Sequence, residues 1–380
     1  MNFNLTKEQE LIQKAAQEFA EKYLEPIAKQ IDEENRVPDE IVKMMADLDL
    51  LGIPFPEEYG GAGAGYSGFV LAMEQLACAS SGAAHIVTVN ALGMGAINRF
   101  GTEEQKRKYL PGGCKGELFG SFAFTEPGTG SDPKQITTTA RKDGNGYILN
   151  GTKRFISNAV FKGPMVTFAR DEDTGRITGY IVDKFCEGYS VSEPWNKIGT
   201  KGGLLVDVYL KDVKVPAENV LGEPGKGFPL LLYGISYGKV GVSSHKLGGA
   251  LAAYREAVKY ALEKTHRGEP IAKFQAIKLA IAEIAEKYEA CKWMVYRLAF
   301  LADTMKDPVQ FAKESALTKD FVCEATIDLT RKAMNVHGSY GLMKDYKIES
   351  LWRDCIMGAQ IEGVSDMQKI IVANTILGQK

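Results

Sequence analysis

The sequence predicts an α+β protein of several domains: an N-terminal all-α domain, a middle antiparallel β domain and a C-terminal four-helix bundle. Apolar residues recur at helical spacing in the first third and again from residue 226 to the end, whereas short β-prone runs separated by turns fill the middle. Because strands and helices are grouped rather than alternating, a doubly wound parallel sheet is not expected.

The first domain is expected over residues 1–117. Thr6 and Gln9 have the spacing of a capping box, which predicts a helix start. The residues Leu11, Ala15, Phe19 and Tyr23 then recur every four positions and predict one apolar stripe. Pro26 predicts a kink or boundary, residues 56–68 a glycine-rich loop, and residues 68–110 further helices.

The second domain, a β-barrel or sandwich, is expected over residues 118–225. Asn150-Gly151 lies between two β-prone runs, a strong signal for a hairpin. A second turn is expected at Asp173-Thr174-Gly175. The alternating run "LLVDVYLKDVKVP", residues 204–216, predicts a half-buried strand.

The third domain is expected over residues 226–380. Apolar residues recur at helical spacing in "GALAAYREAVKYALEK" and in the longer run "KFQAIKLAIAEIAEKYEACKWMVYRLAFLA". These runs predict long helices that pack as a bundle.

Composition excludes several classes of function. Forty-six basic and 48 acidic residues give a net charge of −2, which argues against nucleic-acid or membrane-surface binding through bulk charge. No run is long and apolar enough to predict a membrane span. Six cysteines without a C-x-x-C pair and four histidines without metal-ligand spacing predict no metal site. Reduced thiols and the lack of a presequence signature lead us to expect a cytoplasmic or already processed protein.

Glu362 is the most informative single residue, because it stands in an otherwise apolar or neutral run, residues 361–364. A buried carboxylate is costly unless it is paired or used. One interpretation is an acid that favours the macrodipole of the following helix. The other is an acid that performs chemistry, and Glu362 alone leaves both open.

Two other segments suggest ligand contacts. "SFAFTEPGTGSD", residues 121–132, suits a nest of backbone N–H groups for a phosphate or a flavin edge, or else a surface turn that enters a strand. In "TKRFISNA", residues 152–159, Phe155 and Ser157 are expected on one face of a strand, where they would suit a planar heterocycle. By itself this second segment is also an ordinary strand.

Together, these segments resemble the acyl-CoA dehydrogenase family of flavoproteins. The ordered motifs cover essentially the whole chain: "LTKEQELIQ", "EEYGGAG", "FGTEEQKRKYLP", "TEPGTGSD", "LNGTKRFISN", "VKVPAENVLGEPGKGF", "KLG", "KFQAIK" and "RDCIMGAQIEGVSDMQKII". No single motif is decisive, but the set is specific.

The resemblance implies FAD-dependent α,β-dehydrogenation of an acyl-CoA to the 2,3-enoyl-CoA, or the reverse reduction. Glu362 matches the base that removes the α-proton, while the β-hydride goes to flavin N5. Some members carry the base at the position of Gly238, which cannot serve as one, so the comparison favours Glu362. The resemblance also implies an electron-transferring flavoprotein as partner and a homotetramer, a dimer of dimers.

Further contacts are implied by matching positions. Phe155 would stack near the flavin and Ser157 would hydrogen-bond N5, and Gln275 would reach the FAD of a neighbouring subunit. The full set implied for the cofactor is Phe124, Thr125, Ser131, Phe155, Ser157, Lys264, Gln275, Asn335, Gly338, Ser339, Val364 and Asp366. The set implied for the substrate is Ser131, Ser236, Lys239 and Gly363.

Several positions depart from the family's patterns. The R-x-x-F-G pattern becomes K-T-H-R-G at residues 264–268, Q-x-x-G-G becomes N-V-H-G-S at 335–339, and E-G-T-S-E becomes E-G-V-S-D at 362–366. The D-x-x-R pattern becomes S-Y-G-K at 236–239, where lysine keeps the charge but loses arginine's fork. The frequent Tyr before the base is Ile361, which suggests a pocket widened for a branched, cyclic or otherwise unusual acyl group.

Two alternatives use the same fold. One is an acyl-CoA oxidase that passes electrons to O2, and the other is a non-catalytic homologue that acts as a binding or assembly protein. The sequence leaves open the acyl group, the physiological direction and the identity of the electron partner.

Overall fold

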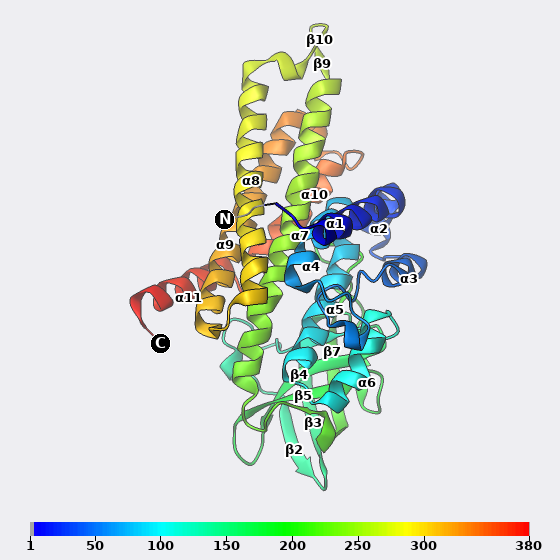
Figure 1. The fold of residues 1–380 in the computed structure, drawn as a ribbon, viewed down its shortest axis with the longest axis vertical. Helices are drawn as coiled ribbons and strands as arrows, with labels where there is room; N and C mark the ends of the chain where they lie inside the picture. The colour runs from blue at the N-terminus through cyan, green and yellow to red at the C-terminus, as the bar shows by residue number, and fades with distance from the viewer. Residues whose placement is uncertain (1–3, 380) are drawn as a thin grey trace.

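The computed structural model describes residues 4–379 and confirms the predicted fold class (Figure 1). Helices form the N-terminal part, a β-sheet domain follows at one end of the molecule, and long helices form the C-terminal part. None of the helices within residues 4–379 is long and apolar enough to cross a membrane.

The N-terminal part contains α1 (Lys7–Phe19), α2 (Ala28–Glu34), α3 (Asp39–Asp47), α4 (Gly65–Ala79), α5 (Ser81–Phe100) and α6 (Glu103–Cys114). The capping box is confirmed, because Gln9 N donates to Thr6 Oγ1 at 3.2 Å and Thr6 N donates to Gln9 Oε1 at 3.0 Å. The boundary at Pro26 is confirmed too, since residues 20–27 form a π turn and a 3₁₀ turn between α1 and α2.

The predicted apolar stripe of α1 is wrong in part. Leu11 and Ala15 are exposed, whereas Ala16 and Phe19 are buried and Ile12 packs against them. A strict four-residue repeat drifts around a helix of 3.6 residues per turn, so only the i, i+4, i+7 set stays on one face.

The β domain holds β1 (Ser121–Ala123), β2 (Thr139–Asp143), β3 (Gly146–Ser157), β4 (Pro164–Asp171), β5 (Ile177–Asp183), β6 (Tyr189–Val191), β7 (Leu205–Pro216) and β8 (Val220–Leu221). The strand order is β6-β7-β3-β2-β4-β5-β8, with β1 paired to β4. The β1–β4 and β2–β4 pairs are parallel, and the other pairs are antiparallel.

The hairpin predicted at Asn150-Gly151 is wrong. β3 runs through both residues with an irregularity in its pairing to β7, and its actual hairpin with β2 turns at residues 144–145. Asn150 instead bonds across to Asp212, whose N–H it accepts at 2.8 Å. Gly151 is required because a Cβ there would lie 2.4 Å from Thr138 Oγ1. The turn at residues 173–175 and the strand at 204–216 are confirmed as the β4–β5 turn and β7.

The C-terminal part contains α7 (Gly227–Glu263), α8 (Gln275–Thr304), α9 (Pro308–His337), α10 (Lys347–Ile356) and α11 (Ser365–Leu377). The small hairpin of β9 (Thr265–His266) and β10 (Glu269–Pro270) joins α7 to α8 at the tip farthest from the β domain (Figure 1). Close backbone contact lets α7 pack against the N-terminal helices, since a Cβ on Gly248 would lie 2.4 Å from Glu74 O of α4.

Candidate active site

The loop between α10 and α11 carries Glu362 in an unusual backbone conformation. Glu362 has φ +53° and Gly363 has φ +87°. A left-handed conformation is uncommon for a residue with a side chain and ordinary for glycine. This pair of residues turns the chain sharply just before α11 begins, and the Glu362 side chain lies against α7.

The Glu362 carboxyl occupies space that a side chain at Gly238 would need. A Cβ on Gly238 would lie 2.8 Å from Glu362 Oε2, and this oxygen is shielded from solvent without a hydrogen-bond partner among residues 4–379. Burial raises the Glu362 pKa to about 7, although the positive charges of Lys239 and Lys319 oppose the rise. Such a carboxyl changes protonation state near neutral pH, as a general acid or base requires.

The "TEPG" turn lies beside the end of β3. Arg154 N donates to Thr125 O at 2.8 Å, which joins the turn to the strand. Glu126 is buried and accepts from Lys153 Nζ at 2.8 Å. Its carboxylate also accepts from Thr137 N at 2.7 Å and Thr138 N at 3.0 Å. These bonds hold Phe124 and Thr125 beside β3.

Phe155 and Ser157 lie at the last residues of β3. Phe155 has φ +60° and is 50% exposed, with its ring edge-to-face against Trp195. Ser157 Oγ lies 2.8 Å from His85 Nε2 of α5. Burial lowers the His85 pKa to about 3, so this imidazole is neutral at physiological pH. The expected one-face arrangement rested on regular alternation, which the left-handed Phe155 and the irregular β3–β7 pairing between Lys153 and Ile156 interrupt.

Helix α7 brings the β domain close to the Glu362 loop. A Cβ on Gly234 would lie 2.4 Å from Phe122 Cζ of β1, whereas Gly238, one turn on, faces Glu362. One turn further, a Cβ on Gly241 would lie 2.5 Å from Thr88 of α5. Three glycines on one helix thus allow β1, the acid and α5 to approach the same side of α7.

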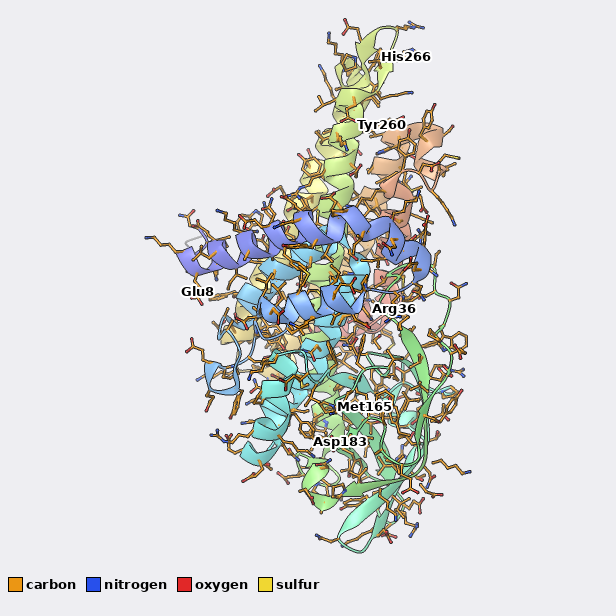
Figure 2. The ribbon with its side chains drawn as sticks, turned by 90° about the vertical axis from the view of Figure 1, so that its right-hand side faces the viewer. Glu8, Arg36, Met165, Asp183, Tyr260 and His266 are labelled. Atoms are coloured by element: carbon orange, nitrogen blue, oxygen red, sulfur yellow. The ribbon has the colours of Figure 1, made fainter. Side chains whose placement is uncertain are left out.

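Five of the residues expected at the cofactor lie far from this region. Lys264, Gln275, Asn335, Gly338 and Ser339 are all exposed and cluster where α7 ends, α8 begins and α9 ends. Helix α7 spans 37 residues, which corresponds to about 55 Å of helix. Figure 2 shows Tyr260 and His266 at this tip, far from Met165 in the β domain. Within one chain, these residues do not meet Glu362.

The remaining expected residues are spread around the loop and the turn. Lys239 is buried beside Glu362, and Val364 follows Gly363 directly. Ser236 is also buried, but its hydroxyl donates to Leu232 O of its own helix at 2.9 Å. Ser131 is exposed in the loop after β1, and Asp366 is exposed in the first turn of α11.

Sequence reasoning missed the groups that hold these residues in place. Lys319 and His85 contact expected site residues through hydrogen bonds between distant parts of the chain, and Gln368 contacts Gly363 from the nearby start of α11. The available signal for Lys319 was its helical spacing from Ala316, Val322 and Cys323, which places it on the buried side of α9. In the described part of the chain, no group of three or more His, Cys, Asp or Glu side chains is arranged to hold a metal ion.

The helical, β and helical domains, with a shielded carboxyl against α7, have the architecture of one family of oxidoreductases. Three acyl-CoA dehydrogenase family models match the chain: the N-terminal domain at residues 6–117, the middle domain at 121–213 and the C-terminal domain at 225–377. The chain belongs to the acyl-CoA dehydrogenase family.

Curated relatives match over nearly the full length. The 3-(aryl)acrylate reductase of Clostridium sporogenes is 42% identical, over 98% of this chain and 99% of that protein. The NADH-dependent acryloyl-CoA reductase of Anaerotignum propionicum is 38% identical, over 99% and 96%. Subunit CarC of the caffeyl-CoA reductase–Etf complex of Acetobacterium woodii is also 38% identical, over 98% and 99%.

Solved structures of other proteins have the same fold as this chain. Butyryl-CoA dehydrogenase from Megasphaera elsdenii superposes with a TM-score of 0.95 at 31% identity, covering 99% of this chain and 100% of that one. An acyl-CoA dehydrogenase from Bacillus anthracis, solved in complex with FAD, gives a TM-score of 0.91 at 30% identity, covering 99% and 68%.

Proposed function

We propose that this protein interconverts an acyl-CoA and its 2,3-enoyl-CoA with bound FAD, using Glu362 as the base that takes the α-proton. The observation that carries the proposal is the shielded, unpartnered Oε2 of Glu362 against Gly238. A buried carboxyl oxygen without a partner is costly, and the α-carbon of a thioester in this space gives it a function.

The residues of the β domain fit a flavin. The half-exposed Phe155 ring, the Ser157 hydroxyl and the turn at Phe124-Thr125 lie together at the end of β3. Aromatic rings and a hydroxyl suit the face and edge of an isoalloxazine. When bound, FAD supplies the hydride chemistry, and the protein supplies orientation and electrostatics.

Glu362 performs the proton step. In the dehydrogenation direction its ionised carboxylate removes the α-proton, and in the reduction direction its protonated form returns that proton. The enolate-like oxygen of the thioester needs a donor aimed at it in advance, and the backbone N–H of Glu362 serves this role in our proposal. Removing the acid from water makes its carboxylate a stronger base.

We propose reduction of a 3-substituted acryloyl-CoA as the physiological direction. The three relatives described above are named as reductases of aryl-acrylate, acryloyl-CoA and caffeyl-CoA. Ile361, which stands before the base, is smaller than tyrosine and leaves more room beside Glu362 for such a substituent. A clear preference for straight-chain butyryl- or octanoyl-CoA would contradict this assignment.

We propose an electron-transferring flavoprotein as the electron partner, in the cytoplasm. One relative is named as a subunit of a complex with such a protein. The six cysteines are free thiols in the structure, as a reducing compartment would keep them.

A homotetramer is part of the proposal. Lys264, Gln275 and Asn335 lie at the far tip of the bundle, so they would reach FAD only on a neighbouring subunit. Large apolar side chains are also exposed on the C-terminal helices, which suits an interface: Leu279, Phe300, Leu317, Phe321, Ile370, Ile376 and Leu377. Light scattering measures the assembly, and Gln275→Ala should reduce the flavin content of the purified protein although Gln275 lies far from its own Glu362.

The decisive test is anaerobic reduction of the flavin by a panel of acyl-CoAs. Glu362→Gln should retain flavin but bleach about 10²- to 10⁴-fold more slowly than the wild type. Glu40→Gln, an exposed acid on α3 and so on a different element from the Glu362 loop, is the matched control and should bleach at the wild-type rate. A flavin-loaded Glu362→Gln protein with unchanged rates would refute the role of Glu362, and rapid peroxide formation in air would indicate an oxidase.

A further inference from the structure

We propose that Lys319 is a positioning residue for the base: it holds the loop that carries Glu362 and supplies a positive charge that favours the ionised carboxylate. This inference rests on the proposed role of Glu362. Lys319 lies on α9, is completely buried, and is separated from the loop by about 40 positions of sequence.

Lys319 bonds to both sides of the turn. Its Nζ donates to Gly363 O at 2.7 Å and lies 3.5 Å from Ala359 O. These two carbonyl groups bracket Glu362 in the sequence. One ammonium group therefore ties together the start and the end of the segment that carries the base.

The loop needs such support because its backbone is strained. Glu362 adopts a left-handed φ of +53° that residues with a side chain rarely keep without surrounding contacts. A second buried donor acts at the same place, since Gln368 Nε2 donates to Gly363 O at 2.9 Å and lies 3.3 Å from Glu362 O. Gly363 O thus accepts from Lys319 and Gln368 together.

The charge of Lys319 acts on the acid as well. Lys239 of α7 and Lys319 of α9 face Glu362, and both lower its pKa against the effect of burial. Burial lowers the Lys319 pKa, while Cys323, Glu362 and the acids Asp320 and Glu324 raise it. The hydrogen bonds of Lys319 go to main-chain carbonyls, which are neutral and do not cancel the ammonium charge. That charge therefore acts on the neighbouring Glu362 carboxylate.

If Lys319 only holds the loop, its replacement should leave the Glu362 pKa unchanged. If its charge also acts on Glu362, its replacement should raise that pKa. The distinguishing measurement is the pH dependence of kcat/KM for acyl-CoA oxidation with an artificial electron acceptor. In flavin-loaded Lys319→Met, the acid limb should move to higher pH by about one unit or more, because an opposite charge that favours ionisation is lost. Lys319→Arg keeps the charge and should leave the limb near its wild-type position.

Lys246→Met is the matched control. Lys246 is another buried lysine, and its Nζ donates to a main-chain oxygen, Asp354 O, at 2.7 Å, whereas the charges that lower the Glu362 pKa are those of Lys239 and Lys319. This variant should leave the acid limb in place even if it lowers stability. If the acid limb lies at the same pH in the wild type and in Lys319→Met, the proposal that the Lys319 charge favours the ionised Glu362 is refuted.

The Glu362→Gln and Lys319→Met variants together distinguish an error about the base from an error about Lys319. An active Glu362→Gln enzyme would refute the base itself and with it this role of Lys319. An inactive Glu362→Gln enzyme, together with an unmoved limb in Lys319→Met, would refute the role of Lys319 alone. If Lys319→Met does not fold, Lys319→Gln provides the same test, because it retains a donor without the charge.

Discussion

Glu362 Oε2 lies only 2.8 Å from the position that a Cβ on Gly238 would take, too close for a side chain there. The acid and the glycine come from elements more than a hundred residues apart, the α10–α11 loop and helix α7. The absence of a side chain at residue 238 therefore leaves the carboxyl the room that it occupies.

Gly238→Ala should reduce catalysis by displacing the carboxyl. Alanine in place of glycine inside a helix normally stabilises a protein by about 1 kcal/mol, but here the methyl group contacts Glu362. We expect kcat for acyl-CoA oxidation to fall by at least about tenfold, since small misplacements of a catalytic group are costly. Stopped-flow reduction of the flavin measures this loss.

Gly95→Ala is the control for that substitution. Gly95 lies inside α5, and its ideal Cβ would approach Tyr66 Oη only to 3.4 Å, an ordinary contact. This variant should keep the wild-type rate and gain stability. A wild-type rate in Gly238→Ala would show that the carboxyl does not need this space.

The direction of the reaction should determine its pH dependence. Burial raises the Glu362 pKa to about 7, so the carboxyl is ionised above that pH and protonated below it. Dehydrogenation requires the ionised form, and its kcat/KM should fall about tenfold per pH unit below the pKa. Reduction of the enoyl-CoA requires the protonated form and should fall above it. Profiles that do not change between pH 5 and pH 9 would contradict Glu362 as the acid–base group.

Glu362→Gln should stabilise the protein in a pH-dependent manner. The folded pKa of about 7 exceeds the ordinary value of 4.5, so the folded protein binds this proton more tightly than the unfolded chain does. Stability from this group is complete below about pH 4.5 and is lost as the pH rises to 7. The shift corresponds to about 3 kcal/mol at most. Urea unfolding at pH 5 and pH 8 should show a larger gain for Glu362→Gln at pH 8.

The buried pair of Lys153 and Glu126 should be more costly to break than to replace. Both side chains are buried, and Nζ lies 2.8 Å from Oε1. Lys153→Met leaves a buried carboxylate without its cation and should cost about 3 to 5 kcal/mol. The double variant Lys153→Met, Glu126→Gln should recover part of this loss, as denaturant unfolding would show. A double variant no more stable than Lys153→Met would mean that the pair is not coupled.

Low pH should weaken the ion pair of Lys153 and Glu126. Although burial opposes it, the Lys153 charge and the hydrogen bonds lower the Glu126 pKa to about 2. A lowered pKa contributes stability above the ordinary value of 4.5 that is lost as the pH falls toward 2. Because Glu126 anchors the turn of Thr125, we expect acid to release bound flavin before global unfolding, which flavin fluorescence would detect.

Features that depend on contacts between residues close in sequence could be predicted from the sequence. The capping box at Thr6 was predicted correctly because its two hydrogen bonds involve residues three apart. The hairpin at Asn150-Gly151 was predicted wrongly because a tertiary contact decides the role of that glycine: Thr138 leaves no room for a Cβ. The stripe of α1 failed for a simpler reason, an incorrect choice of helical period.

The sequence by itself determined the order of helical and β segments, the family, and Glu362 as the acid to examine. These depend on spacing along the chain and on the order of motifs. Only the tertiary structure decided which groups act on that acid. Lys319 and Gly238 reach Glu362 from two different helices, and the pKa of a carboxyl depends on the water and charge that surround it in space.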